Sequence, residues 1–212
     1  MMKIRPLAVE GAWEITPQQH ADPRGSFLEW YRPDRLAEAG VRPFPTAQAN
    51  LSVSAADVVR GVHFADVPPG QAKYVACVTG AAWDVVVDLR VGSPTFGRWD
   101  AVLLDTVDRR AVHLAEGLGH GFCSLSDDTT VVYFCSETYA PQREHTVHPL
   151  DPDLGIVWPV TTPLLSDRDA AAPSLADLLA ADRLPRYDAG TDAGNSMAVP
   201  ERLSLTSSQR TS

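Results

Sequence analysis

Lysine is almost missing from this sequence of 212 residues. Lys3 and Lys73 are the only two, although lysine and arginine together number 18. A genome whose codons favour arginine explains such a shortage, so an internal lysine such as Lys73 is worth following. The chain also has no apolar run near the roughly 20 residues of a membrane span, and no sustained apolar stretch at its start. These absences argue against a membrane-spanning or secreted protein.

Cysteine is also scarce. Cys77, Cys123 and Cys135 lie in separate apolar segments, and none belongs to a C-x-x-C motif. An odd number of scattered thiols does not make a disulfide framework and favours a reducing compartment. We therefore expect a soluble protein of the cytoplasm.

Positive charge is in the minority. The 27 acidic residues outnumber the 18 basic ones, which gives a formal net charge of −9. A charge of that sign argues against nucleic acid or an anionic membrane as the main partner. It remains compatible with a small anionic ligand, because a few local arginines can bind such a ligand.

Helix-length periodic segments are missing from residues 47–137. Short runs rich in valine and aromatic residues follow one another there, separated by Gly, Pro, Asp or Ser. This pattern predicts an all-β fold, namely an antiparallel sandwich, jelly roll or barrel. Short helices are expected at its periphery, over residues 33–40 and 174–183. We expect residues 1–188 to form a single domain and residues 189–212 to form a flexible tail.

Large polar residues interrupt several of the predicted strands. Strand residues alternate between the inside and the outside of a barrel, so a solid barrel would be apolar inside. Any one of these polar residues fits a solvent-exposed face, but together they favour a ligand cavity in the mouth of a barrel. The residues are Gln48, Asn50, Arg60, His63, Lys73 and Tyr133.

Arg60 and His63 have opposite parity, so an ideal strand would point them to opposite faces. Gly61 lies between them. A glycine bulge would reset the alternation and let both side chains face the lumen.

Metal ligands are not found at a recognisable spacing. The stretch HLAEGLGHGF resembles the second motif of cupin barrels, but the segment VHFADV around His63 has no second histidine. A protein metal site needs three or four converging ligands, so we expect no metal. The chain also has neither a serine nucleophile elbow nor a glycine-rich phosphate loop.

Several ordered motifs resemble those of one enzyme family. Residues 22–29 have the sequence DPRGSFLE, residues 48–52 QANLS, residues 59–63 VRGVH and residues 165–169 LSDRD. They are similar to the D-x-R-G-x-F-x-E, Q-x-N-x-S, R-G-x-H and L-S-x-[KR]-D signatures of dTDP-4-dehydrorhamnose 3,5-epimerases. The resemblance extends over about residues 5–187.

The resemblance implies a cupin-like jelly roll that forms a homodimer. It also implies epimerisation of a dTDP-4-keto-6-deoxy sugar without any cofactor. One departure is that Ala65 stands where the family has the Gln of H-x-Q, and another is a slightly longer loop at residues 66–70. These features resemble the branch of the family that serves antibiotic deoxysugar pathways, whose members often invert a single centre, C3 or C5.

The expected chemistry is removal of a proton from a carbon next to the C4 ketone. His63 is the candidate base, because an imidazole with a pKa of about 6.5 is poised near neutrality. The resemblance pairs it with Asp169, which would orient the ring. Tyr133 is the candidate acid on the other face of the sugar, and Lys73 is the candidate stabiliser of the enolate oxygen.

Substrate binding is expected to fall mainly to arginines. Arg24 and Arg60 suit the diphosphate, because a planar guanidinium makes paired charge-assisted hydrogen bonds. The resemblance implies further binding roles, and it implies that the segment with Phe27 and Glu29 can serve the partner subunit's pocket. The residues with these further roles are Phe27, Glu29, Gln48, Asn50, His120, Tyr139 and Glu144.

Two other functions fit parts of the sequence. A non-catalytic jelly roll that binds sugar nucleotides would keep the arginines and aromatic residues, but it would not need His63, Asp169 and Tyr133 together. A metal-dependent cupin oxygenase would need ligands that the motifs do not supply.

Overall fold

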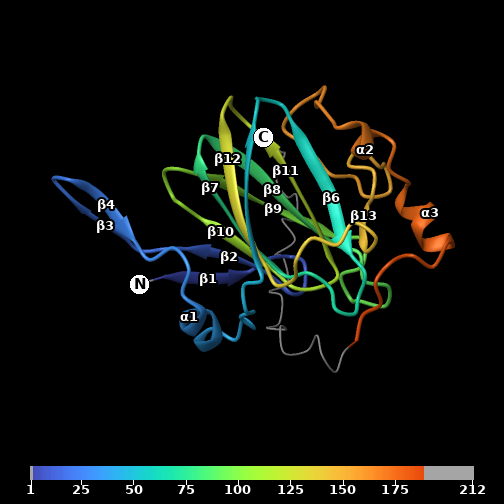
Figure 1. Cartoon of the computed structure of the whole chain (residues 1–212), viewed down its shortest axis with the longest axis horizontal. Helices are drawn as coiled ribbons and strands as arrows, with labels where there is room; N and C mark the ends of the chain where they lie inside the picture. Colours follow the sequence, from blue (N-terminus) through green and yellow to red (C-terminus); the bar gives the residue numbers. More distant parts are fainter. Residues whose placement is uncertain (1, 189–212) are drawn as a thin grey trace, which may run out of the picture.

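Two antiparallel sheets face each other in the computed structural model, which describes residues 2–188 (Figure 1). The tail predicted over residues 189–212 lies outside the described residues. The six-stranded sheet consists of β1 (Lys3–Pro6), β2 (Ala12–Thr16), β10 (Ala111–Leu114), β7 (Lys73–Thr79), β12 (Thr129–Cys135) and β5 (Gln48–Ser54), in that order. The five-stranded sheet consists of β13 (Glu144–Thr146), β6 (Val59–Ala65), β11 (Leu118–Ser124), β8 (Ala81–Asp88) and β9 (Trp99–Asp105). The predicted all-β, cupin-like jelly roll is therefore confirmed.

Short helices lie at the edges of this body, as predicted. Helix α1 (Pro33–Glu38) begins with proline, and α3 (Leu175–Ala180) begins at a capping box made by Ser174 and Asp177. Helix α3 ends at Ala180, whereas the sequence predicted an end at residue 183. A four-residue helix, α2 (Asp167–Ala170), was not predicted because it is too short for a periodic pattern. No helix among residues 2–188 is long and apolar enough to cross a membrane.

The strand alternation divides the core into layers. Val75, Val86 and Val131 point between the two sheets, where one apolar cluster fills part of the interior. A second cluster covers the outer face of the five-stranded sheet, and a third lies beneath α1 on the outer face of the six-stranded sheet. Since the apolar cluster occupies only part of the interior, the remaining inward positions form a polar lumen.

Strand β5 shows the alternation most clearly. Its apolar residues Ala49, Leu51 and Val53 are exposed, whereas Gln48 and Asn50 are half-buried. The polar face of the strand therefore points into the lumen and the apolar face points out. This arrangement is the reverse of an ordinary two-sheet sandwich.

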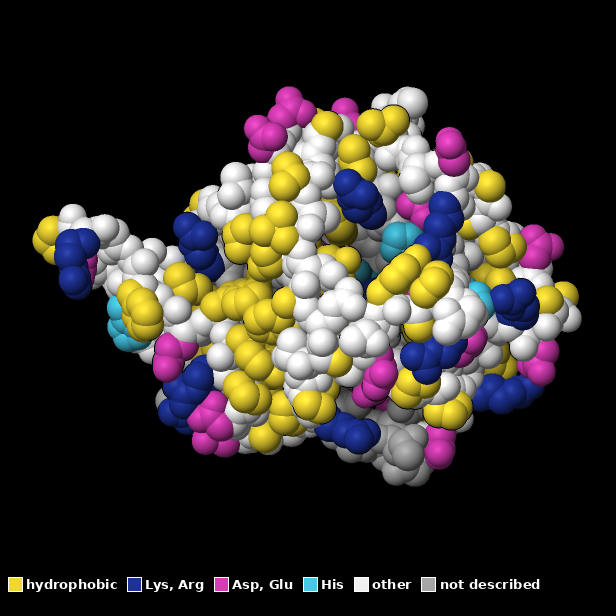
Figure 2. Space-filling view, viewed as in Figure 1, with side chains coloured by type: hydrophobic (Ala, Val, Ile, Leu, Met, Phe, Trp, Pro, Cys, Tyr) yellow, Lys and Arg dark blue, Asp and Glu magenta, His cyan; other side chains and the backbone are white. Residues whose placement is uncertain are grey.

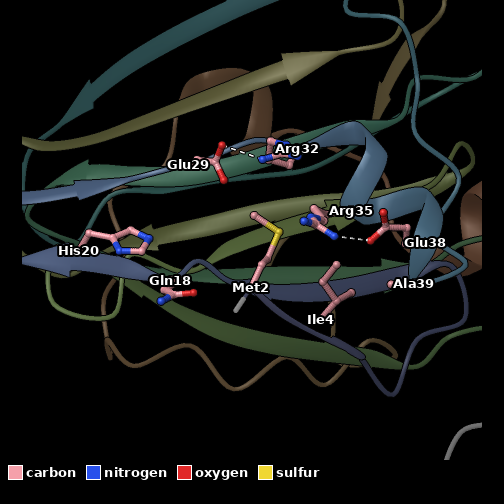
Figure 3. A pocket seen from close by; sticks show the side chains of 9 residues that line it. All are labelled: Met2, Ile4, Gln18, His20, Glu29, Arg32, Arg35, Glu38 and Ala39. Carbon is pink, nitrogen blue, oxygen red and sulfur yellow. Dashed lines mark hydrogen bonds and ion pairs between the residues drawn. The ribbon is translucent and has the colours of Figure 1, made fainter.

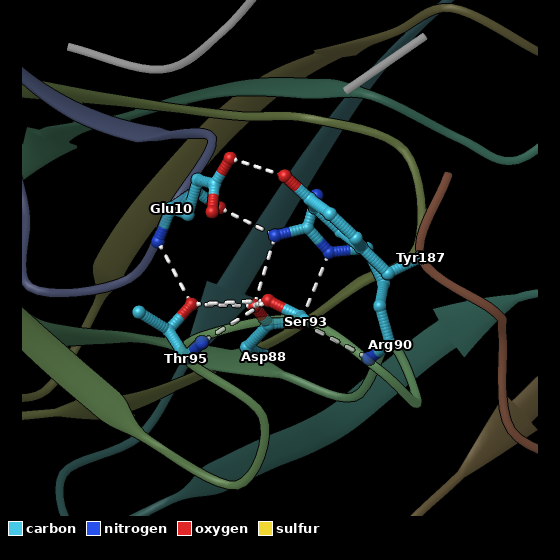
Figure 4. Close-up of polar contacts among 6 residues, drawn as sticks. All are labelled: Glu10, Asp88, Arg90, Ser93, Thr95 and Tyr187. Carbon is cyan, nitrogen blue, oxygen red and sulfur yellow. Dashed lines mark hydrogen bonds and ion pairs between the residues drawn. The ribbon is translucent and has the colours of Figure 1, made fainter. Parts of the chain in front are cut away.

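A buried ionic network anchors both ends of the described chain beside β8 (Figure 4). The Arg90 guanidinium makes a two-pronged ion pair with Asp88 and donates to the backbone oxygen of Glu10. It also lies over the ring of Tyr187, 5.2 Å from the ring centroid, and the Tyr187 hydroxyl donates to Glu10. Ser93 and Thr95 donate to the same Asp88 carboxylate. The network holds β8, which carries part of the lumen, in a fixed position.

A hairpin arm leaves the body near the N-terminus. It consists of β3 (Gln19–Asp22) and β4 (Gly25–Leu28), which pair only with each other among the described strands. Figure 1 shows it extending well away from both sheets.

The predicted bulge at Gly61 is present. The register between β6 and β11 slips here, because His63 lies opposite His120 while Arg60 lies opposite Phe122. Val59 and Val62 both pack in the outer cluster, so Arg60 and His63 both face the lumen. Gly61 has a φ of +124°, and a Cβ at this position would lie 2.7 Å from Gly121 Cα.

Replacing Gly61 should be more damaging than replacing a glycine in open space. We expect Gly61→Ala to lower the free energy of unfolding by about 3 kcal/mol, because backbone strain and overpacking each cost about 1–3 kcal/mol. Gly92 also has a positive φ, but nothing lies near its missing Cβ. Gly92→Ala should therefore cost only about 1 kcal/mol. Urea denaturation measures both values, and equal losses would contradict the close backbone approach.

Candidate active site

The lumen contains a histidine–carboxylate pair that links β6 to α2. His63 Nε2 lies 2.8 Å from Asp169 Oδ1, and the Gly61 amide donates to the other carboxylate oxygen at 3.5 Å. Asp169 is held in place because its own amide donates to Ser166, the N-cap of α2. The Asp169 side chain is only 5% exposed, whereas that of His63 is 35% exposed. The buried partner thus orients an imidazole that ligands can reach.

The protonation state of this pair follows from its surroundings. Burial lowers the pKa of His63 below 6.5, against the opposing effect of the hydrogen bond to Asp169. Burial raises the pKa of Asp169, but the hydrogen bond and the charge of His63 outweigh it, so the net shift is downward. At neutral pH the carboxylate is therefore charged and the imidazole neutral. With Nε2–H donated to Asp169, the lone pair on Nδ1 remains available as a base.

A second histidine–carboxylate pair lies on the neighbouring strands. His120 Nε2 lies 2.8 Å from Asp84 Oδ2, and both residues are buried. His120 stands directly opposite His63 in the sheet register. Asp84 is a charged residue on an otherwise apolar strand segment, and the sequence analysis did not assign it a role.

Lys73 enters the lumen from the six-stranded sheet. It lies opposite Leu114 and Cys135 in the register, and it is buried. Burial lowers the pKa of Lys73, while the charges of Glu144 and Asp84 act in the other direction. Among residues 2–188, the Nζ atom makes no hydrogen bond or ion pair with a protein group. The buried amino group is therefore available to a ligand.

Tyr133 faces the lumen from β12, across from the sheet that carries His63. Burial raises the pKa of Tyr133, and the nearby charge of Glu144 raises it further while that of Arg60 lowers it. The phenol is therefore fully protonated at neutral pH. Arg60 stands at the mouth, where it donates to Ser54 of β5 at 3.1 Å and so connects the two sheets. Figure 2 shows this mouth as a hollow with histidine at its floor and basic side chains at its rim.

A chain of side-chain amides follows the rim of the lumen. Gln48 donates to Asn50 at 2.8 Å, and Asn50 donates to the sulfur of Cys135. The Gln48 side-chain oxygen accepts from the backbone amide of Tyr139. The Tyr139 side chain itself is exposed, so it lies at the rim rather than inside.

Three predicted binding residues lie outside the lumen of their own chain. Arg24 and Phe27 are on the hairpin arm, and the Arg24 side chain is 90% exposed and paired with Asp22. Glu29 pairs with Arg32 and lines a separate cavity of about 410 Å³ between the arm and α1 (Figure 3). The fold therefore brings ten of the thirteen predicted site residues to the lumen or its rim. These are His63, Asp169, Tyr133, Lys73, Gln48, Asn50, Arg60, His120, Tyr139 and Glu144.

Two residues of the lumen were missed in the sequence. Asp84 could have been found as a lone charge among the valines of residues 82–87. Arg168 precedes Asp169 in a quoted motif, and its charge acts on His63. Within residues 2–188, no group of three or more His, Cys, Asp or Glu side chains could hold a metal ion.

Comparison with known proteins identifies the family. The family model described as dTDP-4-dehydrorhamnose 3,5-epimerase matches residues 6–177. The chain belongs to this family. It is 64% identical over 186 residues to a dTDP-4-dehydrorhamnose 3-epimerase of Streptomyces niveus, covering 88% of this chain and 90% of the relative.

Solved structures of epimerases have the same fold. A 4-keto-6-deoxy sugar epimerase from the novobiocin gene cluster of Streptomyces spheroides superposes with a TM-score of 0.86 at 61% identity, covering 92% of this chain and 96% of that one. A 3′-monoepimerase of Streptomyces bikiniensis, solved with dTDP-quinovose, superposes with a TM-score of 0.84 at 53% identity, covering 89% and 96%. The motifs quoted from the sequence had pointed to this dTDP-sugar epimerase family.

The two histidine pairs allow a direct test of the site's electrostatics. We expect His63 to titrate below 6.5 in an NMR pH titration, because burial is the dominant effect on its pKa. Asp169→Asn removes two contributions that raise this pKa, so His63 should then titrate at still lower pH. The imidazole resonances of His145, which pairs with Asp66 at 2.6 Å, should be the same in Asp169→Asn as in the wild type at any one pH. A rise in the pKa of His63 in Asp169→Asn would contradict this account.

Proposed function

We propose that this protein epimerises a dTDP-4-keto-6-deoxyhexose, without a cofactor, by moving a proton at a carbon next to the C4 ketone. The observation that carries the proposal is the buried His63–Asp169 pair, which leaves Nδ1 of His63 available in a lumen that Tyr133 enters from the opposite sheet. The family membership and the dTDP-sugar bound to a related monoepimerase support the substrate class.

The reaction divides into two proton transfers. His63 Nδ1 takes the proton from the ring carbon, and the electron pair of that C–H bond moves toward the C4 oxygen to give an enolate. The buried ammonium of Lys73 stabilises the negative charge where it develops. Tyr133 then donates its hydroxyl proton to the same carbon from the other face. Exchange with water returns the proton to Tyr133 and removes it from His63, so no group is consumed.

Inversion at C3 alone is the outcome we propose, in an antibiotic deoxysugar pathway. The 64% identical relative is named a 3-epimerase, and the related epimerase at 61% identity comes from the novobiocin cluster. Ala65, two residues after His63 on the same face of β6, lies opposite Glu144. Ala65 stands where the family motif H-x-Q has Gln, so this lumen has a small apolar side chain at that position.

Deuterium exchange tests the function directly. Incubation with dTDP-4-keto-6-deoxyglucose in D₂O should place deuterium at C3 with inversion there, as read by NMR. His63→Ala should lower the rate at least about 100-fold, the usual size of a general-base contribution. His148 lies outside the lumen, so His148→Ala should react at the wild-type rate. If the wild-type protein incorporates no deuterium at C3 or C5, the proposed function is wrong.

We also propose that the active form is a homodimer. Leu51 and Val53 are 64% and 53% exposed on the outer face of β5, an edge strand, and Val78 of β7 is exposed on the same sheet. Figure 2 shows apolar side chains gathered over this face, next to the arm. A second copy on this face would cover apolar surface of a kind that monomers seldom expose. It would also explain why Arg24, Phe27 and Glu29 lie away from their own lumen, since the arm can complete the partner's site.

A charge on this face should separate the subunits. We expect sedimentation of the wild-type protein to give the mass of a dimer, and Leu51→Glu to shift it toward the monomer. Val157 is exposed to a similar degree on a loop elsewhere, so Val157→Glu should remain dimeric. A monomeric wild-type protein, or a fully dimeric Leu51→Glu, would contradict this interface.

The cysteines support a cytoplasmic location. Cys77, Cys123 and Cys135 are free and buried, so none is poised to form a disulfide.

A further inference from the structure

One oxygen of the buried Asp84 carboxylate has no hydrogen-bond partner among residues 2–188. The side chain is fully buried, and Oδ2 accepts from His120 at 2.8 Å. Oδ1 has no hydrogen-bond partner among the residues that the structure describes. Buried polar atoms are nearly always satisfied, and a buried charge is costly unless it is paired. An unsatisfied carboxylate oxygen at this depth therefore needs an explanation.

Asp84 lies on the inward face of its strand. Its neighbours on that face, Ala82 and Val86, both belong to the apolar cluster between the sheets. The carboxylate is thus at the boundary between the apolar half of the interior and the polar lumen. Two basic side chains reach the same boundary. His120 of β11 hydrogen-bonds Asp84, and Lys73 of β7 is close enough for the charge of Asp84 to raise its pKa.

We propose that Asp84 is a positioning residue that orients the His120 ring and supplies a counter-charge to Lys73 beside the enolate oxygen. This inference rests on the proposed function and deepens it. The Asp84 carboxylate fixes the His120 ring through Nε2–H, which leaves Nδ1 to face the lumen. Its second oxygen can accept a hydrogen bond from the Lys73 ammonium during the reaction. Burial lowers the pKa of Lys73, and the charge of Asp84 raises it.

Other acidic groups near Lys73 are less suited to this task. The charge of Glu144 also raises the pKa of Lys73. However, Glu144 lies on the edge strand β13, and one of its carboxylate oxygens accepts a hydrogen bond from the Ala140 amide. Burial raises the pKa of the Cys135 thiol, so the thiol is neutral at pH 7. Asp169 is committed to His63 and Gly61. Other charged or titratable groups of the lumen lie further along it: the charges of Lys73 and Arg168 act on His63, and that of Arg60 acts on Tyr133.

Asp84→Asn keeps the shape and removes the charge. We expect kcat for epimerisation to fall at least about 10-fold while KM changes less than about threefold, because the lost interaction acts in the transition state. The Asp84 charge raises the pKa of Lys73, so its loss lowers that pKa further. The alkaline limb of the kcat–pH profile should therefore move about one unit toward lower pH. A purely structural role would lower the melting temperature without moving this limb.

Asp66 offers a matched control. Its carboxylate makes an equivalent hydrogen bond to His145, 2.6 Å long, outside the lumen. Asp66→Asn should keep the wild-type kcat and pH profile. ¹⁵N-histidine NMR provides a readout independent of turnover. In Asp84→Asn the Nε2–H signal of His120 should move upfield as its hydrogen bond weakens, while that of His145 stays unchanged.

The outcomes separate this inference from the proposed function. If wild-type protein incorporates no deuterium from D₂O, the function is wrong, and the Nε2–H signal of His120 still tests the link to Asp84. If wild-type protein exchanges deuterium but Asp84→Asn keeps the kcat and the alkaline limb of the wild type, the positioning role is overturned. An unchanged Nε2–H signal of His120 in Asp84→Asn overturns it as well.

Discussion

The close approach of two glycine backbones, at Gly61 of β6 and Gly121 of β11, is the constraint on which the site depends. A Cβ at Gly61 would collide with the neighbouring strand, and the extra residue of the bulge exists only because that space is empty. Without the bulge, Arg60 and His63 would point to opposite faces of the sheet. At the same bulge, the Gly61 amide donates a hydrogen bond to Asp169. Gly61 therefore both resets the strand alternation and helps to hold the carboxylate that orients His63.

The lumen is electrostatically balanced by pairs whose members come from different elements. Asp169 reaches His63 from a four-residue helix, and Asp84 reaches His120 from an adjacent strand. In each pair the carboxylate is the more deeply buried member and the imidazole faces the cavity. Desolvation alone would neutralise a carboxylate such as Asp169, but the hydrogen bond from His63 keeps its pKa low. Each pair fixes the orientation of one imidazole, so two histidine rings are held in place within one small volume.

Much of this arrangement could be predicted from the sequence because the signals are local. The strand periodicity gave the all-β class, and the isolated glycine between Arg60 and His63 predicted the bulge. Pairings across more than 100 residues, such as His63 with Asp169, have no local signal and came only from the resemblance to a family. Helix α2 and the pairing of Asp84 with His120 were missed as well, although Asp84 is visible in the sequence as a lone charge. A four-residue helix has no period, and a single aspartate among valines shows its partner only when two strands are adjacent.

The scarcity of lysine acquires a physical meaning in the lumen. Arg90, the buried arginine beside β8, has its planar fork occupied by Asp88 and the Glu10 backbone, which is how a guanidinium is satisfied away from water. Lys73 is buried as well, yet no protein group accepts a hydrogen bond from it within the described chain. An arginine at that position would need several fixed acceptors and would lock onto them. A compact ammonium on a flexible stem needs only a nearby counter-charge such as Asp84, and its own charge is then available to an oxygen that becomes negative only during the proposed reaction.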